Sequence, residues 1–577
     1  MTPYLKLLLR EKNALMRAGR IEQANALAAR IDKAIIAFNS GWLSSANSIN
    51  NSHDMWDKVR KVTNKTAATS ANNSFTAEAL NTHYAAISSD TSYTAPPPKH
   101  SCTEVIQWPC EEQIFKSLDR LKVTAAGLDG IPSWYLKLIA AAICKPLTHA
   151  LFLSLQQSTV PSQWKLSAIT PINKIPQPTS CADFRPISLT PILSRVTEKL
   201  VIREFIYPLL NQPSSVFGRS VSDQFAFRPT GSTTAALIAI LSGATEMLET
   251  NEYVHLVSFD FSKAFDTVRH SSLFSKLAQL AMPDYVYNWL LDFFSERQHC
   301  TRFNSQISTL LPISASVVQG SALGPVAFII NASDLHTVSD SNKLFKYADD
   351  IYMLVPASNS ASIPLELSHI SNWANANNLR LNQSKTHELI VTRKNSRRTS
   401  VPPATTNLNR VLTLTILGVT MNGNLDAGEH VSSLISRGGQ SLYALKTLKA
   451  HGLAGKSLLS VCKSTFVSSF MYASPAWSGF SSLDMISRLE AMLKKSKRWG
   501  LTGGLDLETF SELSDRHDQK LFSKVKNNPC HVLHSLLPPV KSCGYHLRTR
   551  VHNFTLPSKS VSLCRNFLYR MLFKDVY

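Results

Sequence analysis

Two adjacent aspartates interrupt an apolar and aromatic run, and they constrain the fold more than any other feature of this chain. The run is Lys346-Tyr347-Ala348-Asp349-Asp350-Ile351-Tyr352-Met353-Leu354. Such a run predicts a half-buried strand, in which neighbouring side chains point to opposite faces. Asp349 and Asp350 therefore converge only if the chain turns there, as at the tip of a hairpin. An ordinary acidic turn is the alternative reading of this run alone, since short motifs match by chance.

A second short apolar run, residues 253–259, also ends on a carboxylate, Asp260. A helix is expected after it, with Ser271 as N-cap and apolar residues at helical spacing. Three carboxylates at neighbouring strand ends form an oxygen-rich site that suits Mg²⁺. Two such ions, about 3.5–4 Å apart, would activate a 3′-hydroxyl and stabilise a leaving pyrophosphate.

Further motifs stand in a fixed order along the chain. They are FDFSKAFDTV (259–268), QGSALGP (319–325), YADD (347–350), DFRPISL (183–189), FRPTGST (227–233), NQSKT (382–386) and LGV (417–419). The first three resemble the palm motifs of reverse transcriptases, and more narrowly those of non-LTR (LINE-type) retrotransposons. The next two resemble the fingers motifs, and the last two resemble the motif after the catalytic hairpin and the primer grip. The resemblance covers residues 100–500, and the ordered set is far more specific than any single motif.

The resemblance implies an α+β fold with the right-hand polymerase architecture of fingers, palm and helical thumb, and a helical N-terminal extension. In the family an endonuclease commonly precedes this region, and we expect this chain to lack one. The expected divisions are a helical connector (1–65), a linker (66–100), a reverse transcriptase domain (155–421), a helical thumb (425–500) and a basic C-terminal segment (501–577). Within them, fingers are expected over 101–245 and palm over 250–395.

The resemblance also assigns roles to single residues. Asp260, Asp349 and Asp350 match the metal ligands, and the backbone carbonyl of Phe261 is an expected further ligand. Phe265 stands where the family places a steric gate that rejects a 2′-hydroxyl, although a core aromatic is the alternative.

Other positions are expected to contact the nucleotide. Gln319 and Gly320 would line its pocket, and the glycine would allow close backbone approach. Val318 replaces the usual proline of the family, which predicts a less rigid loop. Lys385 would sit near the leaving pyrophosphate. Arg185 and Arg228 are candidates for triphosphate or template contact, with a structural salt bridge as the alternative for each.

Asp266 is not expected to bind a metal. It is predicted to cap the following turn or to pair with Arg269.

The amino-acid composition limits the kinds of binding partner and the cellular compartment that are expected. The net charge is +20, from 60 Lys and Arg against 40 Asp and Glu, which favours a polyanionic partner. The nine cysteines form no paired framework, and this indicates an intracellular protein of the cytoplasm or nucleus. No apolar run reaches the length of a membrane span. The tail spacings Cys530-x3-His534 and Cys543-x2-His546 do not form a standard zinc finger.

These observations predict an RNA-directed DNA polymerase of a retrotransposon. Its expected cofactor is Mg²⁺, two ions, with Mn²⁺ as a substitute, and its expected partners are an RNA template, a DNA or RNA primer and deoxynucleoside triphosphates. An RNA-directed RNA polymerase is disfavoured by Phe265. An inactive or co-opted copy that binds RNA is disfavoured by the three intact aspartates. The sequence leaves the oligomeric state open.

Overall fold

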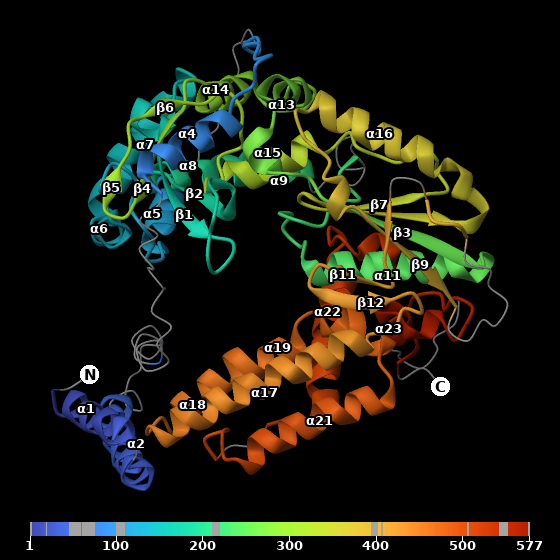
Figure 1. The fold of residues 1–577 in the computed structure, drawn as a ribbon. Coiled ribbons are helices and arrows are strands. Elements are labelled where there is room, and N and C mark those ends of the chain that lie inside the picture. Colours follow the sequence, from blue (N-terminus) through green and yellow to red (C-terminus); the bar gives the residue numbers. More distant parts are fainter. Residues whose placement is uncertain are drawn as a thin grey trace. The chain divides into compact units, whose positions relative to one another are not determined.

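The structure is a computed structural model and has the α+β composition that the sequence predicts (Figure 1). It describes residues 3–18, 20–44, 59, 75–99, 110–210, 220–393, 402–405, 408–504, 507–541 and 552–574. The chain divides into two compact units. Unit 1 comprises residues 1–70, 415–523 and 569–574, and unit 2 comprises 71–414, 524–568 and 575–577.

The central element of unit 2 is a five-stranded sheet with strand order β10-β9-β3-β8-β7. Its strands are β3 (Tyr253–Phe259), β7 (Lys343–Tyr347), β8 (Asp350–Pro356), β9 (His387–Thr392) and β10 (Asn409–Arg410). The middle strand β3 pairs antiparallel with both β8 and β9. Strand β8 is apolar from Ile351 onward and is buried along that length, as expected for a strand covered on both faces. This sheet is the expected palm.

Helix α11 (Thr233–Thr250) packs on this sheet and contacts β3, β7 and β8. It begins at Ser232, whose side chain accepts a hydrogen bond from the Ala235 amide, a standard N-cap interaction. Unit 2 also contains α12 (Ala264–Thr267), α13 (His270–Leu277), α14 (Asp284–Phe294), α15 (Leu323–Asn331) and α16 (Ile363–Ala376). Helix α13 has Arg269 as its N-cap, without a side-chain cap. The prediction of Ser271 was therefore wrong by two positions.

A second sheet of unit 2 has the order β2-β1-β4-β5, and β6 also pairs with β4. Its strands are β1 (Leu166–Asn173), β2 (Phe184–Leu189), β4 (Gln298–Phe303), β5 (Gln306–Ile307) and β6 (Leu311–Pro312). The accompanying helices are α5 (Glu111–Asp119), α6 (Ser133–Leu138), α7 (Ala140–Gln156), α8 (Ile192–Val201) and α9 (Tyr207–Leu210). These elements fall mainly in the region expected to be the fingers.

Helix α4 (Ala77–Ile87) lies inside the stretch expected to be a linker and differs from that expectation. Its Leu80 and Tyr84 are buried against Ile169 and Phe184 of the second sheet. The Asn81 side chain bonds both to the Thr309 carbonyl, at 2.9 Å, and to the Thr301 hydroxyl, at 3.0 Å. The Ser, Thr and Asn content that suggested a linker thus serves helix capping and buried hydrogen bonds.

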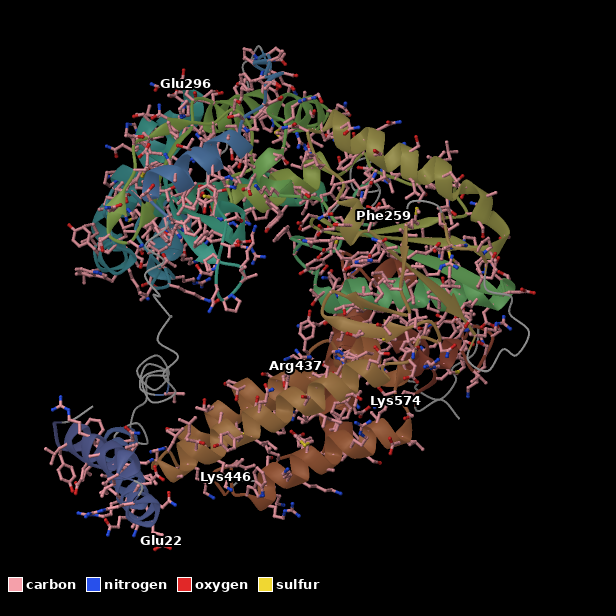
Figure 2. The ribbon with its side chains drawn as sticks, viewed as in Figure 1. Glu22, Phe259, Glu296, Arg437, Lys446 and Lys574 are labelled. Atoms are coloured by element: carbon pink, nitrogen blue, oxygen red, sulfur yellow. The ribbon has the colours of Figure 1, made fainter. Side chains whose placement is uncertain are left out.

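Unit 1 is mainly helical, as expected for residues 425–500. It contains α1 (Pro3–Arg17), α2 (Ile21–Ser44), α17 (Gly428–Ala450), α18 (Gly455–Cys462), α19 (Ser468–Met471), α20 (Ser474–Trp477) and α21 (Leu483–Arg498). Strands β11 (Thr413–Ile416) and β12 (Val419–Asn422) form a separate two-stranded sheet, and α22 (Phe510–Asn527) and α23 (Phe567–Phe573) follow late in the chain. Arg437 and Lys446 mark the course of α17 (Figure 2). No helix in the described ranges is long and apolar enough to cross a bilayer.

The expected C-terminal segment, residues 501–577, is divided between the two units, because residues 524–568 belong to unit 2. Asn566 donates a hydrogen bond to Thr245 of α11, and Ser560 donates one to Glu249 at 3.0 Å. His534 Nδ1 is bound to the Val525 carbonyl at 2.8 Å. Cys543 and His546 lie outside the described residues. In the described part of the tail, His534 therefore stabilises the local fold.

Candidate active site

The β7–β8 turn brings the two adjacent aspartates to one end of the palm sheet. Tyr347 pairs with Asp350, so only Ala348 and Asp349 form the loop. Ala348 has a φ of +58°, which suits the first loop position of a tight hairpin turn. Phe259 pairs with Ile351, and the same register continued by one residue sets Asp260 beside Asp350. The predicted turn at the aspartates is confirmed.

The electrostatics of the three carboxylates show that they act on one another. Desolvation raises the pKa of Asp350 to about 6, and repulsion from Asp349 and Asp260 adds to the shift. The Asp350 side chain still reaches solvent. The pKa of Asp349 is also raised, by desolvation and by Asp260, while the Arg185 cation opposes the shift.

A divalent cation fits this donor set, since it would neutralise carboxylates that repel one another. All six side-chain oxygens are hard donors of the kind that Mg²⁺ and Mn²⁺ prefer. In the described part of the chain, however, no three His, Cys, Asp or Glu side chains already stand as a closed metal cluster.

Asp260 is held by the segment that follows α16. Asn382 donates to Asp260 twice, from its backbone amide to the carbonyl at 2.8 Å and from its side chain to Oδ2 at 3.2 Å. Lys385 Nζ lies 3.7 Å from the same Oδ2. Asn382 was not predicted as a site residue, although it belongs to the same motif, NQSKT, as Lys385. Phe261 continues the edge of β3 through a bridge to Leu381.

The Phe265 ring lies just past the end of β3 and is half-buried. It stacks on Phe328 of α15 at 4.7 Å between centroids and meets Phe227 edge-on at 6.3 Å. Its carbonyl accepts the Val317 amide at 2.9 Å, so the gate candidate and the loop before Gln319 are joined. Both aromatic contacts hold the ring in one orientation.

The loop of Gln319 and Gly320 lies against β2. The Ser188 amide donates to the Gln319 carbonyl at 2.8 Å. Gly320 has a φ of +125°, and a Cβ added there would stand 2.2 Å from the Ser188 carbonyl oxygen. Only glycine fits this approach. Val318 is buried, so the loop is fixed by packing and hydrogen bonds in place of the proline ring.

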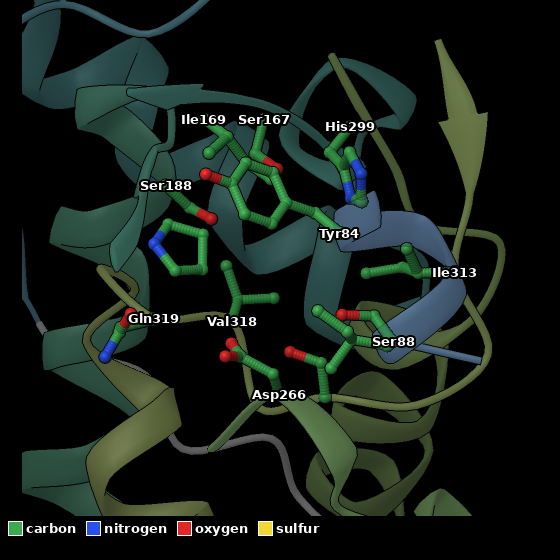
Figure 3. Close-up of a pocket in the computed structure, with 13 residues that line it drawn as sticks. Tyr84, Ser88, Ser167, Ile169, Ser188, Asp266, His299, Ile313, Val318 and Gln319 are labelled. Atoms are coloured by element: carbon green, nitrogen blue, oxygen red, sulfur yellow. The ribbon is translucent and has the colours of Figure 1, made fainter. Parts of the chain in front are cut away.

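A small polar cavity lies beside this loop (Figure 3). Its volume is about 20 Å³, room for about one water molecule. Tyr84, Asp266, His299 and Gln319 line it. Among the described residues, Tyr84 Oη, His299 Nε2 and Gln319 Oε1 are buried without a hydrogen-bond partner. Tyr84 was not predicted as a site residue, since it comes from α4, far away along the chain.

Asp266 faces this cavity, and burial raises its pKa to about 6, although Lys263 and Lys174 oppose the shift. The predicted pairing with Arg269 is wrong. Arg269 Nε instead donates to Asp90 Oδ2 at 2.9 Å.

The two candidate arginines are placed differently. Arg185 is exposed on β2, and its charge acts on Asp349. Arg228 donates to backbone carbonyls of Val221, at 2.9 Å, and Leu210, at 3.3 Å, and its pKa is lowered by burial. The structure thus brings Arg185 to the aspartates and engages Arg228 in holding the loop before α11.

Residues 172–421 match the family model described as "Reverse transcriptase (RNA-dependent DNA polymerase)". This part of the chain is a reverse transcriptase domain. The domain contains the three aspartates, both candidate arginines, Phe265, Gln319, Gly320 and Lys385. The predicted reverse transcriptase domain is confirmed over residues 172–421, and its predicted bounds of 155–421 share the C-terminal limit of the match.

Curated relatives extend the similarity beyond the reverse transcriptase domain. The chain is 25% identical over 461 residues to the "Probable RNA-directed DNA polymerase from transposon BS" of Drosophila melanogaster, covering 74% of this chain and 49% of the relative. It is 29% identical over 290 residues to the "RNA-directed DNA polymerase from mobile element jockey" of the same species, covering 48% and 31%. The chain thus spans half or less of the length of these relatives.

Solved structures of telomerase are also similar. One from Candida tropicalis, in complex with a fragment of telomeric RNA, has 13% sequence identity and a TM-score of 0.36 and covers 68% of each chain.

Proposed function

We propose that this chain is an RNA-directed DNA polymerase of the non-LTR retrotransposon type. It would extend the 3′ end of a DNA or RNA primer along an RNA template, using deoxynucleoside triphosphates. The observation that supports this most is the meeting of Asp260 with the Asp349–Asp350 hairpin at one end of the palm sheet, within reach of the Arg185 charge.

Asp260, Asp349 and Asp350 would hold two Mg²⁺ ions, which Mn²⁺ can replace. When bound, these ions supply charge stabilisation to an in-line displacement at phosphorus. Arg185 would bind the triphosphate, because it is exposed and its charge acts on Asp349. Lys385 Nζ lies 3.7 Å from Asp260 Oδ2 and would place its charge near the leaving pyrophosphate.

The remaining pocket residues would orient the nucleotide. Phe265 would lie under the sugar and exclude a 2′-hydroxyl, and Gln319 and Gly320 would flank it. The primer 3′-hydroxyl would lie toward the hairpin tip, where Asp350 reaches solvent.

A basic cleft of about 860 Å³ in unit 2 offers a site for the template. Apolar groups such as Phe227, Pro325 and Val326 share its walls with cations, and no acidic side chain is among its described lining residues. Cations that follow phosphates and rings that stack on bases are typical of single-stranded nucleic-acid sites. The lining cations are Arg120, Lys122, Arg195, Lys199, Arg203 and Arg228.

The test is the Asp349→Asn variant, assayed for nucleotide incorporation on a primed RNA template in Mg²⁺. We expect incorporation to be abolished, because one ligand of the two-metal step is lost. RNA affinity should stay within a few-fold of wild type, since it rests on Lys and Arg. Asp340→Asn makes the same charge change at an exposed position before β7 and should keep full activity. Normal extension by Asp349→Asn would refute the assignment of Asp349 as a catalytic residue. Loss of activity in both variants would show that the effect is not specific to Asp349.

A further inference from the structure

A buried carboxylate outside the proposed catalytic set contacts the nucleotide loop directly. Glu198 lies on α8 and is 0% exposed. Its Oε2 accepts the Ala322 amide at 2.6 Å and the Leu323 amide at 3.0 Å. Its Oε1 accepts the Ser194 hydroxyl at 2.8 Å. The Glu198 carboxylate therefore binds the start of α15, two positions after Gly320.

The amides that Glu198 binds are the free donors at the N-terminus of α15. An anion there is stabilised by those donors and by the helix dipole. Arg297 balances the charge from within the core, because its guanidinium is fully buried and interacts with Glu198. Burial lowers the pKa of Arg297 to about 10, and Glu198 acts against that shift. A buried carboxylate is costly unless compensated in this way.

Glu198 and β2 together hold the loop from both ends. The Ser188 amide fixes the Gln319 carbonyl at 2.8 Å. Gly320 is pressed so closely to Ser188 that a Cβ would meet its carbonyl oxygen at 2.2 Å. Glu198 then fixes the peptide groups at 322 and 323. The two residues between these anchors, Gly320 and Ser321, have little freedom, and they include the glycine that approaches β2.

We propose that Glu198 is a positioning residue for nucleotide binding, which acts by holding the Gln319–Gly320 loop in place through the Ala322 and Leu323 amides. This inference rests on the proposed polymerase function. It explains why the loop is ordered although Val318 stands where a proline is usual in the family. The carboxylate replaces backbone rigidity by two charge-assisted hydrogen bonds.

The experiment compares three substitutions at this position in the full chain. Glu198→Leu removes the acceptor at similar volume. Glu198→Gln keeps an acceptor oxygen for the amides and a donor for Ser194. Glu198→Asp keeps the charge opposite Arg297 but withdraws the carboxylate by one methylene, so it carries the test if Glu198→Leu does not fold. Glu204→Leu is the matched control, since Glu204 is an exposed carboxylate near the end of the same helical segment.

In Glu198→Leu we expect the KM for the nucleotide to rise about tenfold and kcat to change by less than about threefold, because loop placement affects binding of the nucleotide. The dissociation constant for primed template should stay within about twofold of wild type. Glu198→Asp should fall between wild type and Glu198→Leu, and Glu198→Gln should restore most of the KM. An unchanged KM in a folded Glu198→Leu or Glu198→Asp variant would overturn the proposal. So would a loss of RNA affinity in step with KM, or a Gln variant as impaired as the Leu variant.

A second readout does not depend on activity. Hydrogen exchange of the amides at 322 and 323 should accelerate in Glu198→Leu and Glu198→Asp and stay unchanged in Glu204→Leu. Unaltered protection of these amides would overturn the proposal. If the wild-type protein incorporates no nucleotide, the proposed function fails, and the exchange result still decides whether Glu198 holds the loop.

Discussion

Phe265 shows how one side chain can serve both packing and selection. Its ring is stacked on Phe328 at 4.7 Å and is only half-buried. The stacked face belongs to the core, and the exposed part is available to a sugar bound next to Asp260. Because packing fixes the ring, a clash with a 2′-hydroxyl cannot be relieved by rotation of the side chain.

Truncation of this ring should separate its two roles. In Phe265→Val we expect discrimination against ribonucleotides to fall by about two powers of ten, with a modest loss of deoxynucleotide efficiency. The measurement is the ratio of the two incorporation efficiencies. Phe345→Val removes a buried palm ring that stacks on Phe225 at 6.4 Å and should lower both efficiencies without changing the ratio. An unchanged ratio in folded Phe265→Val would remove Phe265 from the site.

The residues that the sequence predicted are those close to a motif. Asp260, Asp349 and Asp350 were found because carboxylates in apolar runs are conspicuous, and the hairpin turn follows from the same pattern. Tyr84 and Glu198 were missed because each lies in a different part of the chain, and only tertiary packing brings it to the loop. The partner of Arg269 was missed for the same reason, since Asp90 lies 179 positions away.

At the scale of elements, the approach of the 318–322 loop to β2 depends on the absence of a side chain at Gly320. We expect Gly320→Ala to lower nucleotide incorporation by at least about a hundredfold, because the added Cβ would displace the loop from Ser188. Gly439→Ala is the control, since a Cβ at this exposed position of α17 meets no atom within 4 Å. It should leave activity unchanged and stabilise the helix by up to about 1 kcal/mol. Wild-type incorporation by Gly320→Ala would refute the tight contact.

Strand β9 is tied to the middle of the palm sheet by a buried ionic network. Glu388 bonds to His255 Nδ1 at 2.8 Å, to the Thr405 hydroxyl at 2.6 Å and to Arg410 Nε at 2.7 Å. Burial alone would raise the pKa of Glu388, but the hydrogen bonds of these three groups and the Arg410 charge lower it to about 2. The ionised form is therefore favoured by the fold.

This network predicts the direction of a pH effect. Because the folded pKa lies below the unfolded value of 4.5, the stabilisation is fully present above pH 4.5 and is lost as pH falls toward about 2. Its magnitude is roughly 3 kcal/mol at neutral pH. The gap in thermal midpoint between wild type and Glu388→Gln should be constant at neutral pH and narrow in acid. Glu252→Gln changes an exposed carboxylate and should have the same thermal midpoint as wild type at every pH. A gap that widened in acid would contradict the assignment.

The elements were predicted with uneven success for physical reasons. Apolar strands next to carboxylates and the long helices of unit 1 have strong local patterns. Helix α4 was mistaken for part of a linker, because its polar residues are satisfied by partners on β4 and beyond that no local pattern reveals.

At the scale of the whole molecule, the +20 charge predicts that RNA binding weakens steeply with salt. Each phosphate contact releases counterions, and the slope of log affinity against log salt is about −0.7 per contact for single strands. Lys122→Ala/Lys199→Ala should therefore flatten the slope by about 1.4, because both side chains line the basic cleft. Lys137→Ala/Lys145→Ala removes the same charge from exposed positions outside the described lining and should leave the slope as in wild type. A flat wild-type dependence would show that the charge does not serve RNA binding.

The parts of unit 2 are not translated consecutively, because a segment of unit 1 lies between them in the sequence. Residues 415–523 are translated before residues 524–568, although only the later stretch belongs to unit 2. Until Ser560 and Asn566 leave the ribosome, α11 lacks the partners that bind its Glu249 and Thr245. During synthesis, the face of α11 that carries Thr245 and Glu249 therefore lacks these partners. A premature stop codon after residue 523 would leave this face without them permanently. Messages cut short near their 3′ end would thus yield a protein with every proposed catalytic residue but an unfinished fold, a substrate for chaperones and proteases.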